Sequence, residues 1–270
     1  AELYDTQVEL ITRLAKAAEL RDDDTGAHID RVGRICERVA LQLGMAPREA
    51  ERLRIASTLH DVGKIGVSDG VLLKRGELNS EEWEAMMAHT TTGATLLSGS
   101  RSPLLQMAEV IARTHHERWD GTGYPEGLKG EQIPLVGRIC AICDVFDALA
   151  SRRSYKDPWA FDRVVREIER KRGSHFDPRV VDAFLKVIDE FRGETWEAAD
   201  APAPAAAEGA SAAAEGEPAA EVPAGAGAGA GDSGWEPPGD PIALDDAIAA
   251  RAVAARGPAG RRPSQGRVPR

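Results

Sequence analysis

The composition of the chain changes abruptly near Trp196, and this boundary limits what can fold. Before it, the sequence is an ordinary globular mixture. After it, Ala, Pro, Gly and Glu dominate with almost no branched or aromatic residues, so this segment cannot bury enough apolar surface to offset the entropy lost on ordering its backbone. We therefore expect the fold to lie within residues 1–196 and predict that residues 197–270 form a disordered tail.

Before the boundary, apolar residues recur at intervals of three and four, the period of a helix with one buried face. Proline and capping residues mark the expected helix starts, and strand alternation is nowhere convincing. We predict an all-α fold, a helical bundle of about seven or eight helices. The expected helices cover residues 1–20 or begin near His28, Pro47, Asn79, Pro103, Pro134, Pro158 and Asp177.

Residues 1–20 are predicted to form an amphipathic connecting helix, because apolar positions such as Leu10 and Leu14 suit a neighbouring helix or a coiled coil. We expect a homodimer through this helix. Because the pattern starts without a cap and the first residue is not Met, we also expect an upstream receiver or sensor domain.

Charge and cysteine content exclude several classes of protein. The formal net charge is −10, whereas a surface that binds duplex nucleic acid is usually basic, so we expect no such partner. Three cysteines without the spacing of secreted domains fit a reducing cytoplasm, and we interpret Cys140 and Cys143 as core residues. No apolar run approaches the roughly 20 residues of a membrane span. The prediction is a cytoplasmic protein.

The strongest candidates for metal ligands are His60 and Asp61, which are adjacent in the run Leu59–Gly66. An imidazole beside a carboxylate can give two neighbouring metal ions one ligand each or a shared bridge. A helix from Pro47 is expected to end at Gly63, which places the pair at its C-terminal end. Lys64 follows as a cation that could face a phosphate.

Five of the six histidines occur in contexts that suit metal ligands. Helices that face one interior can bring such ligands together, and we expect His89 within the helix that begins at Asn79. The candidate metal ligands are Asp24, His28, His60, Asp61, His89, His115, His116 and Asp144. Mixed imidazole and carboxylate donors suit iron, manganese, zinc or nickel, and hydrolysis of a phosphate ester is the expected chemistry.

Two motifs, Leu59-His60-Asp61-Val62-Gly63-Lys64 and the run from His115-His116 to Gly123-Tyr124-Pro125, resemble those of the HD-GYP family of cyclic-di-GMP phosphodiesterases. The resemblance extends from about Leu10 to Leu185 and includes the order and spacing of the motifs. It implies a helical HD-domain fold with an HD-GYP extension, here assigned to residues 21–196.

The resemblance also implies an activity and a metal centre. The expected reaction is hydrolysis of cyclic-di-GMP to linear pGpG, in some members onward to GMP, in bacterial second-messenger signalling. Two or three divalent ions are expected, most commonly iron or manganese. Family members with three metals usually have Glu where this chain has Asp24, so the third ion is an open question.

Further roles come from the family. Lys64 resembles a lysine that contacts a phosphate oxygen, and Tyr124 resembles a substrate contact. The segment Arg153-Ser154-Tyr155-Lys156 retains the family's phosphate-binding Arg153 and Lys156, although its usual proline is absent. The expected catalytic residues are thus His60, Asp61 and Lys64, and GGDEF-domain proteins are expected partners.

Several alternatives stay open. Another cyclic dinucleotide such as cyclic GMP-AMP could be the substrate, and a non-catalytic cyclic-di-GMP receptor is a third function, although retention of every ligand favours catalysis. Asp147 could orient a ligating histidine or be a solvated helix residue. Glu117 and Asp120 are expected to shape turns, and His175 is not assigned to the metals.

Overall fold

The computed structural model describes residues 2–19, 21, 27–74, 76, 78–151 and 158–193. The predicted tail, residues 197–270, lies outside the described residues. So do Asp24, Arg153 and Lys156, whose predicted roles are therefore untested.

Helices form the whole described architecture, apart from one isolated bridge between Arg172 and Phe176, and the predicted all-α class is confirmed. The α-helices are α1 (Glu2–Glu19), α2 (Ala27–Gln42), α3 (Pro47–Ser57), α4 (Asp69–Leu72), α5 (Ser80–Met87), α6 (His89–Leu97), α7 (Pro103–Thr114), α8 (Leu135–Ala150), α9 (Phe161–Arg170) and α10 (Pro178–Val187). The 3-10 helices are η1 (Val62–Gly66), η2 (Gly130–Gln132) and η3 (Ile188–Phe191).

The described residues contain ten α-helices rather than about eight, because the short α4 was not expected and one expected helix divides. The helix that begins at Asn79 ends at Met87, and His89 opens α6 instead of continuing the same helix. Packing accounts for the break. No residue of α5 is buried, whereas α6 buries His89 and Gly93 and packs against η1 and α7.

Helix α3 ends at Ser57, earlier than expected, so His60 and Asp61 lie in the turn between α3 and η1. The hydroxyl of Ser57 donates to a backbone carbonyl three residues earlier, which competes with continuation of the helix. The chain then tightens into η1 against α6. A Cβ atom on Gly63 would lie 1.8 Å from the carbonyl oxygen of His89, so this approach requires glycine.

Several predicted helix starts are confirmed. Proline occupies the first turn of α3, α7 and α10. The Asn79 side chain accepts a hydrogen bond from the backbone N–H of Glu82, whose carboxylate in turn accepts from the N–H of Asn79. The side chain of Asp177 accepts from the N–H of Arg179 at the start of α10. Local capping thus explains where these helices begin.

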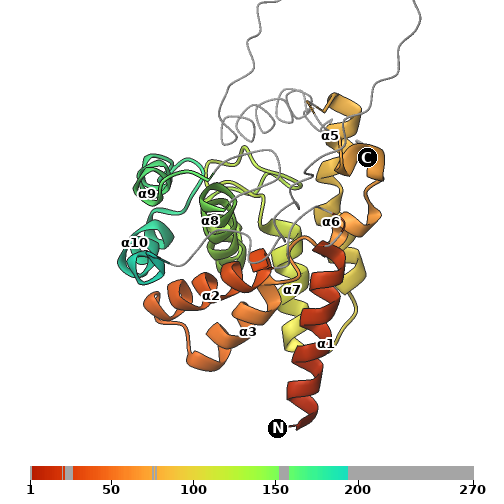
Figure 1. The fold of residues 1–270 in the computed structure, drawn as a ribbon, viewed down its shortest axis with the longest axis horizontal. Helices are drawn as coiled ribbons and strands as arrows, with labels where there is room; N and C mark the ends of the chain where they lie inside the picture. Colours follow the sequence, from red (N-terminus) through yellow and green to blue (C-terminus); the bar gives the residue numbers. More distant parts are fainter. Residues whose placement is uncertain are drawn as a thin grey trace, which may run out of the picture.

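The hydrophobic core lies where α2, α3, α7, α8 and α10 meet, with α8 running through the middle of the bundle (Figure 1). Helix α1 lies along one side and contacts α3 and η1. The three cysteines are free and buried, and all belong to this core, as expected for Cys140 and Cys143. None of the described helices is both long and apolar enough to cross a bilayer.

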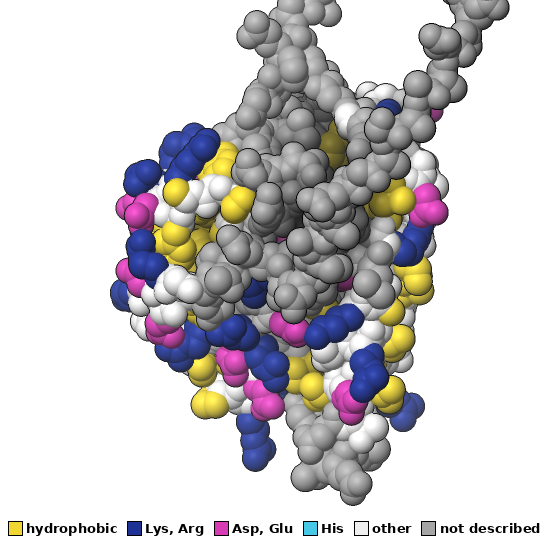
Figure 2. Space-filling model, in the orientation of Figure 1, with side chains coloured by type: hydrophobic (Ala, Val, Ile, Leu, Met, Phe, Trp, Pro, Cys, Tyr) yellow, Lys and Arg dark blue, Asp and Glu magenta, His cyan; other side chains and the backbone are white. Residues whose placement is uncertain are grey.

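Figure 2 shows one face of the molecule, on which basic and acidic side chains alternate rather than gather by sign. The histidines are mostly internal: His28, His60, His89 and His115 are buried. The fold therefore places its most reactive side chains inside the bundle.

Candidate metal centre

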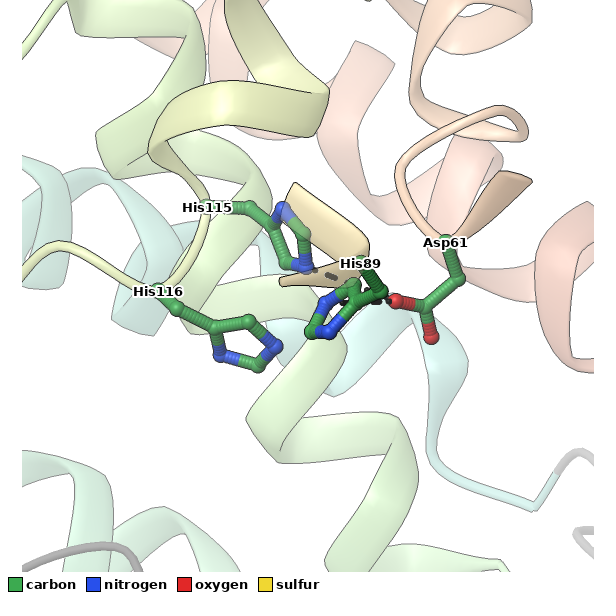
Figure 3. A group of neighbouring side chains, drawn as sticks. All are labelled: Asp61, His89, His115 and His116. Carbon is green, nitrogen blue, oxygen red and sulfur yellow. Dashed lines mark ion pairs between the residues drawn. The ribbon is translucent and has the colours of Figure 1, made fainter. Parts of the chain in front are cut away.

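A first group of candidate ligands consists of Asp61, His89, His115 and His116, with one ligand atom from each lying within 4.8 Å of the others. Asp61 comes from the turn after α3, His89 from the start of α6, and the adjacent histidines from the end of α7. Oδ1 of Asp61 lies 3.3 Å from Nε2 of His89 and 3.5 Å from Nε2 of His115 (Figure 3). We call this set the four-residue group.

A second group consists of His28 from α2, His60 and Asp144 from α8. Oδ1 of Asp144 lies 3.4 Å from Nε2 of His28 and 3.7 Å from Nε2 of His60. Nε2 of His60 is also 3.4 Å from Oδ2 of Asp61. The two carboxylate oxygens of Asp61 thus face different groups, the geometry expected of a bridging carboxylate. We call the second set the three-residue group.

Backbone carbonyls orient three of these imidazoles. Nδ1 of His60 lies 2.8 Å from the carbonyl oxygen of Ser57, and Nδ1 of His89 lies 2.7 Å from that of Met86. Nδ1 of His115 lies 3.1 Å from two carbonyl oxygens of α7. A carbonyl only accepts hydrogen bonds, so Nδ1 carries the proton in each case. Nε2 is left with its lone pair directed into the group.

A buried carboxylate orients His28. Nδ1 of His28 lies 2.5 Å from Oδ2 of Asp147, which is fully buried on α8. The Arg31 guanidinium donates to both oxygens of Asp147, at 2.6 and 3.0 Å, and the Ser151 hydroxyl donates at 3.1 Å. Asp147 can therefore orient His28, and its burial excludes the alternative that it is a solvated helix residue. Arg31 completes this support and was not anticipated from sequence.

Four buried atoms at the centre have no hydrogen-bond partner among the described residues: Nε2 of His60, His89 and His115, and Oδ1 of Asp61. Leaving such atoms unpaired costs free energy, and native proteins rarely do so without an ion or water to satisfy them. A divalent cation in each group would accept all these lone pairs. The donor set therefore fits metal ions that bind imidazole and carboxylate.

Electrostatics differ between the groups. Burial lowers the pKa of His60, but Asp61 and Asp144 outweigh it and raise that pKa to about 9. Burial also disfavours charge on His28, yet the carboxylates of Asp147 and Asp144 raise its pKa well above the ordinary value. In the four-residue group, burial lowers the pKa of His89 to about 4. Without metal, the first two imidazoles are protonated at neutral pH and the third is not.

Both carboxylates of the centre stay ionised. Burial would raise the pKa of Asp61, but Lys64 and His60 hold it well below the ordinary value. The same competition, with His28 and His60 as the cations, lowers the pKa of Asp144. Each group therefore contains an ionised carboxylate that can bind a divalent cation.

Two of the predicted substrate residues lie at the centre. Nζ of Lys64 is 2.7 Å from Oδ2 of Asp61, and its side chain keeps partial access to solvent. The Tyr124 ring stacks on His116, with centroids 4.8 Å apart and planes inclined by 25°. Both therefore lie beside the candidate ligands, and their roles toward substrate are still predictions.

Hydrogen bonds to two carboxylates of the loop after His116 determine its conformation. The Glu117 carboxylate, which is buried, accepts backbone hydrogen bonds from Glu126, Gly127 and Leu128 at 2.7 to 3.1 Å. Asp120 accepts from the backbone and hydroxyl of the residue two positions later. These contacts match the expected turn-shaping roles. They hold the segment that carries Tyr124 against the four-residue group.

The last residue of α1, Glu19, is a charged group near the centre that the sequence analysis missed. Its side chain is buried, and its neighbours along the inward face of the helix are Ile11 and Ala15. A glutamate in register with this apolar stripe is the signal that could have revealed it.

Comparisons with known proteins identify the family of this chain. The HD domain family matches residues 12–180. The 3′3′-cGAMP-specific phosphodiesterase 2 of Vibrio cholerae is 47% identical over 190 residues, which cover 70% of this chain and 36% of that protein. The cyclic di-GMP phosphodiesterase of Thermotoga maritima is 47% identical over 189 residues, which cover 70% of this chain and 51% of that one. The chain thus spans about half the length of these relatives, or less.

Among solved structures, the crystal structure of a cyclic GMP-AMP specific phosphodiesterase from V. cholerae aligns with a TM-score of 0.51 and 24% identity. The alignment covers 67% of this chain and 48% of that one. At this level of identity the likeness shows a shared fold alone.

Proposed function

The chain belongs to the HD-domain family, and from this premise we propose that it is a metal-dependent phosphodiesterase that hydrolyses cyclic-di-GMP to linear pGpG. Its resemblance to the HD-GYP group is confirmed by relatives of high identity that are named cyclic di-GMP phosphodiesterases. A further cleavage of pGpG to GMP is part of the hypothesis to be tested.

The observation that carries the proposal is the position of Asp61 between the two ligand groups. Its oxygens lie 3.3 and 3.4 Å from imidazole nitrogens of different groups, and those nitrogens have no hydrogen-bond partner among the described residues. Divalent ions bound there would supply Lewis-acid stabilisation of a phosphoryl group and an activated water. The residues themselves provide buried imidazole and carboxylate ligands of the kind that such ions require.

We assign Lys64 to the substrate phosphate. Its ammonium lies beside Asp61 at the edge of the centre, where it can contact a phosphoryl oxygen and stabilise developing negative charge. We assign Tyr124, whose ring stacks on His116 of the four-residue group, to a contact with the substrate. Arg153 and Lys156 keep their proposed phosphate contacts, although they lie outside the described residues.

For the metals we propose iron or manganese, with zinc and nickel as the other candidates that imidazole and carboxylate donors suit. We propose that each of the two groups holds one ion. A third ion would involve Asp24, which lies outside the described residues.

The second candidate function is hydrolysis of 3′3′-cyclic GMP-AMP. It is favoured by the 47% identity to a relative that is named as specific for this dinucleotide. Lys64 would contact a phosphate in either substrate and would not distinguish the bases. A receptor without activity is disfavoured, because both ligand groups are complete.

Product analysis tests the proposal. The full chain, purified without oxygen and with its metals counted, is incubated with cyclic-di-GMP, 3′3′-cyclic GMP-AMP and cyclic-di-AMP, and the products are separated by chromatography. We expect pGpG from cyclic-di-GMP as the fastest reaction. Preferential cleavage of cyclic GMP-AMP would select the second function, and metal-loaded protein that cleaves none of them would overturn both.

Partners and location are part of the same hypothesis. The side chains of Leu10 and Leu14 on α1 are 56% and 66% exposed, which supports association through this helix as a homodimer or with an upstream receiver or sensor domain. We also propose a cytoplasmic location, where cyclic dinucleotides act, and interaction with GGDEF-domain proteins through the loop that carries Tyr124.

A further inference from the structure

The carboxyl group of Glu19 is buried without adequate partners. Its residue is only 4% exposed, and Oε2 has no hydrogen-bond partner within the described part of the chain. Burial of a carboxylate in this condition is unfavourable unless a cation or hydrogen-bond donor compensates it. Four other acidic or imidazole groups with such unpaired atoms, His60, Asp61, His89 and His115, belong to the metal centre.

Glu19 is the last residue of α1, which packs against η1 directly after Asp61. Burial raises its pKa most strongly and Asp61 raises it further, whereas Lys64, His28 and His60 lower it. These four charged groups surround the junction between the two ligand groups. No carboxylate oxygen of Glu19 is among the atoms that form either group, so it lies outside the direct ligand set.

The end of α1 is held against η1, the segment that follows Asp61. The Arg21 guanidinium donates to the carbonyl oxygens of Ile65 at 2.8 Å and Val67 at 3.0 Å, and pairs with Asp69 at 2.6 Å. Because Arg21 is two residues from Glu19, this clamp also limits how far the Glu19 carboxylate can move from the centre.

The three-residue group has too little negative charge of its own to balance a divalent ion. Among the described residues, the three-residue group has one carboxylate of its own, Asp144, and shares Asp61 with the other group. The nearby Asp147 is paired with Arg31 and adds little net charge. A divalent ion at His28 and His60 would therefore have an excess of positive charge, which a buried anion on the α1 side would offset.

We propose that Glu19 is an anionic positioning residue outside the ligand set, which strengthens binding of a divalent ion in the three-residue group. The inference rests on the metal-dependent function proposed above and names a residue that α1 contributes to it. Because α1 carries this charge, displacement of the helix would weaken the same ion site.

The test is a titration of the full chain with Mn²⁺ after its metals have been removed. Calorimetry measures the heat of binding, and electron paramagnetic resonance measures the free Mn²⁺. We expect Glu19→Gln to weaken the lower-affinity binding step about 10- to 100-fold, the range seen when groups outside the ligand set are lost. Glu19→Asp, which keeps the charge, should recover part of the affinity. Glu9→Gln is the matched control, because Glu9 is an exposed glutamate on the same helix.

Thermal unfolding of the metal-free variants separates this role from a structural one. Glu19→Gln removes a buried charge without adequate partners, so we expect the metal-free variant to be as stable as the wild type or more stable. Unchanged Mn²⁺ affinity in Glu19→Gln, or weaker binding that only accompanies loss of stability without metal, would overturn the inference. Wild-type protein that binds no Mn²⁺ would instead contradict the proposed function.

Discussion

The two ligand groups differ in what orients their imidazoles and in the protons they carry. In the four-residue group, Nδ1 of His89 and of His115 donates a hydrogen bond to a backbone carbonyl, and burial lowers the pKa of His89 to about 4. In the three-residue group, Nδ1 of His28 forms a hydrogen bond with the carboxylate of Asp147, and nearby carboxylates raise the pKa of His60 to about 9. Main-chain carbonyls orient the four-residue group, whereas the three-residue group combines a main-chain carbonyl at His60 with buried charges at His28.

This difference has a consequence for metal binding. Imidazole binds metal in its neutral form, so an ion must displace protons from His28 and His60 but not from His89. We therefore expect the four-residue group to bind its ion more tightly at neutral pH. The three-residue group should also be more sensitive to substitution of surrounding side chains.

The largest effect is expected from Asp61→Ala, which removes the residue shared by both groups. Loss of this carboxylate should lower turnover by about 1,000-fold or more and reduce the metal content, because the buried imidazoles lose their common anion. Turnover and metal content per chain are the measurements. Asp30→Ala, at an exposed residue paired with Lys16, is the control. Full metal content with normal turnover would remove Asp61 from the mechanism.

Lys64→Ala should separate substrate binding from metal binding. We expect the activation barrier to rise by roughly 2–4 kcal/mol, as when one electrostatic donor to a phosphoryl group is deleted. Metal content should not fall, because an ammonium group has no lone pair and cannot be a metal ligand. Lys74→Ala, at a residue that pairs with Glu82 away from the centre, is the comparison. A normal rate would show that Lys64 has no part in catalysis.

Asp147→Asn should affect one group alone. The amide preserves the shape of the side chain but removes the charge that orients His28, so affinity for the ion in the three-residue group should fall about 10- to 100-fold. A two-step Mn²⁺ titration measures this, and only the weaker step should shift. Asp162→Asn, an exposed change in α9, should shift neither. Equal loss in both steps would contradict the separation of the groups.

The smallest effect is expected in the pH dependence of stability of the metal-free protein. Below pH 6.5 the unfolded chain gains protons that buried His89 does not accept until about pH 4, so stability falls with acid. Above pH 6.5 the protons held by His60 in the fold are lost as pH rises toward about 9, so stability falls again.

Thermal unfolding between pH 4 and 9 should therefore show a maximum near pH 6.5, with shifts of about 2–4 °C per kcal/mol. His60→Gln should flatten the alkaline side and His89→Gln the acid side. A profile in which either substitution flattens the opposite side would contradict the assignment of protons to the two groups.

The sequence predicted the all-α class and most helix starts, because capping residues and first-turn prolines act locally. It did not predict the break at Ala88 or the early end of α3. Both depend on the packing of η1 against α6, where Gly63 approaches the backbone of His89, and no local signal reports this distant contact.

Of the site, the histidines and aspartates brought together in the two groups were all named from sequence. Adjacent pairs such as His60 and Asp61 carry their own chemical signal. Glu19 and Arg31 were missed, since each looks like an ordinary charged residue of an amphipathic helix until folding buries Glu19 and pairs Arg31 with Asp147. Asp147 was ambiguous for the same reason.

The central claim is that Asp61 lies between two ions held by different groups. Anomalous diffraction from crystals of the full chain loaded with Mn²⁺ tests it most directly. The account predicts one manganese peak beside His89 and His115 and another beside His28 and His60, with an oxygen of Asp61 directed at each. Manganese confined to other parts of the molecule, with both groups empty, would contradict it.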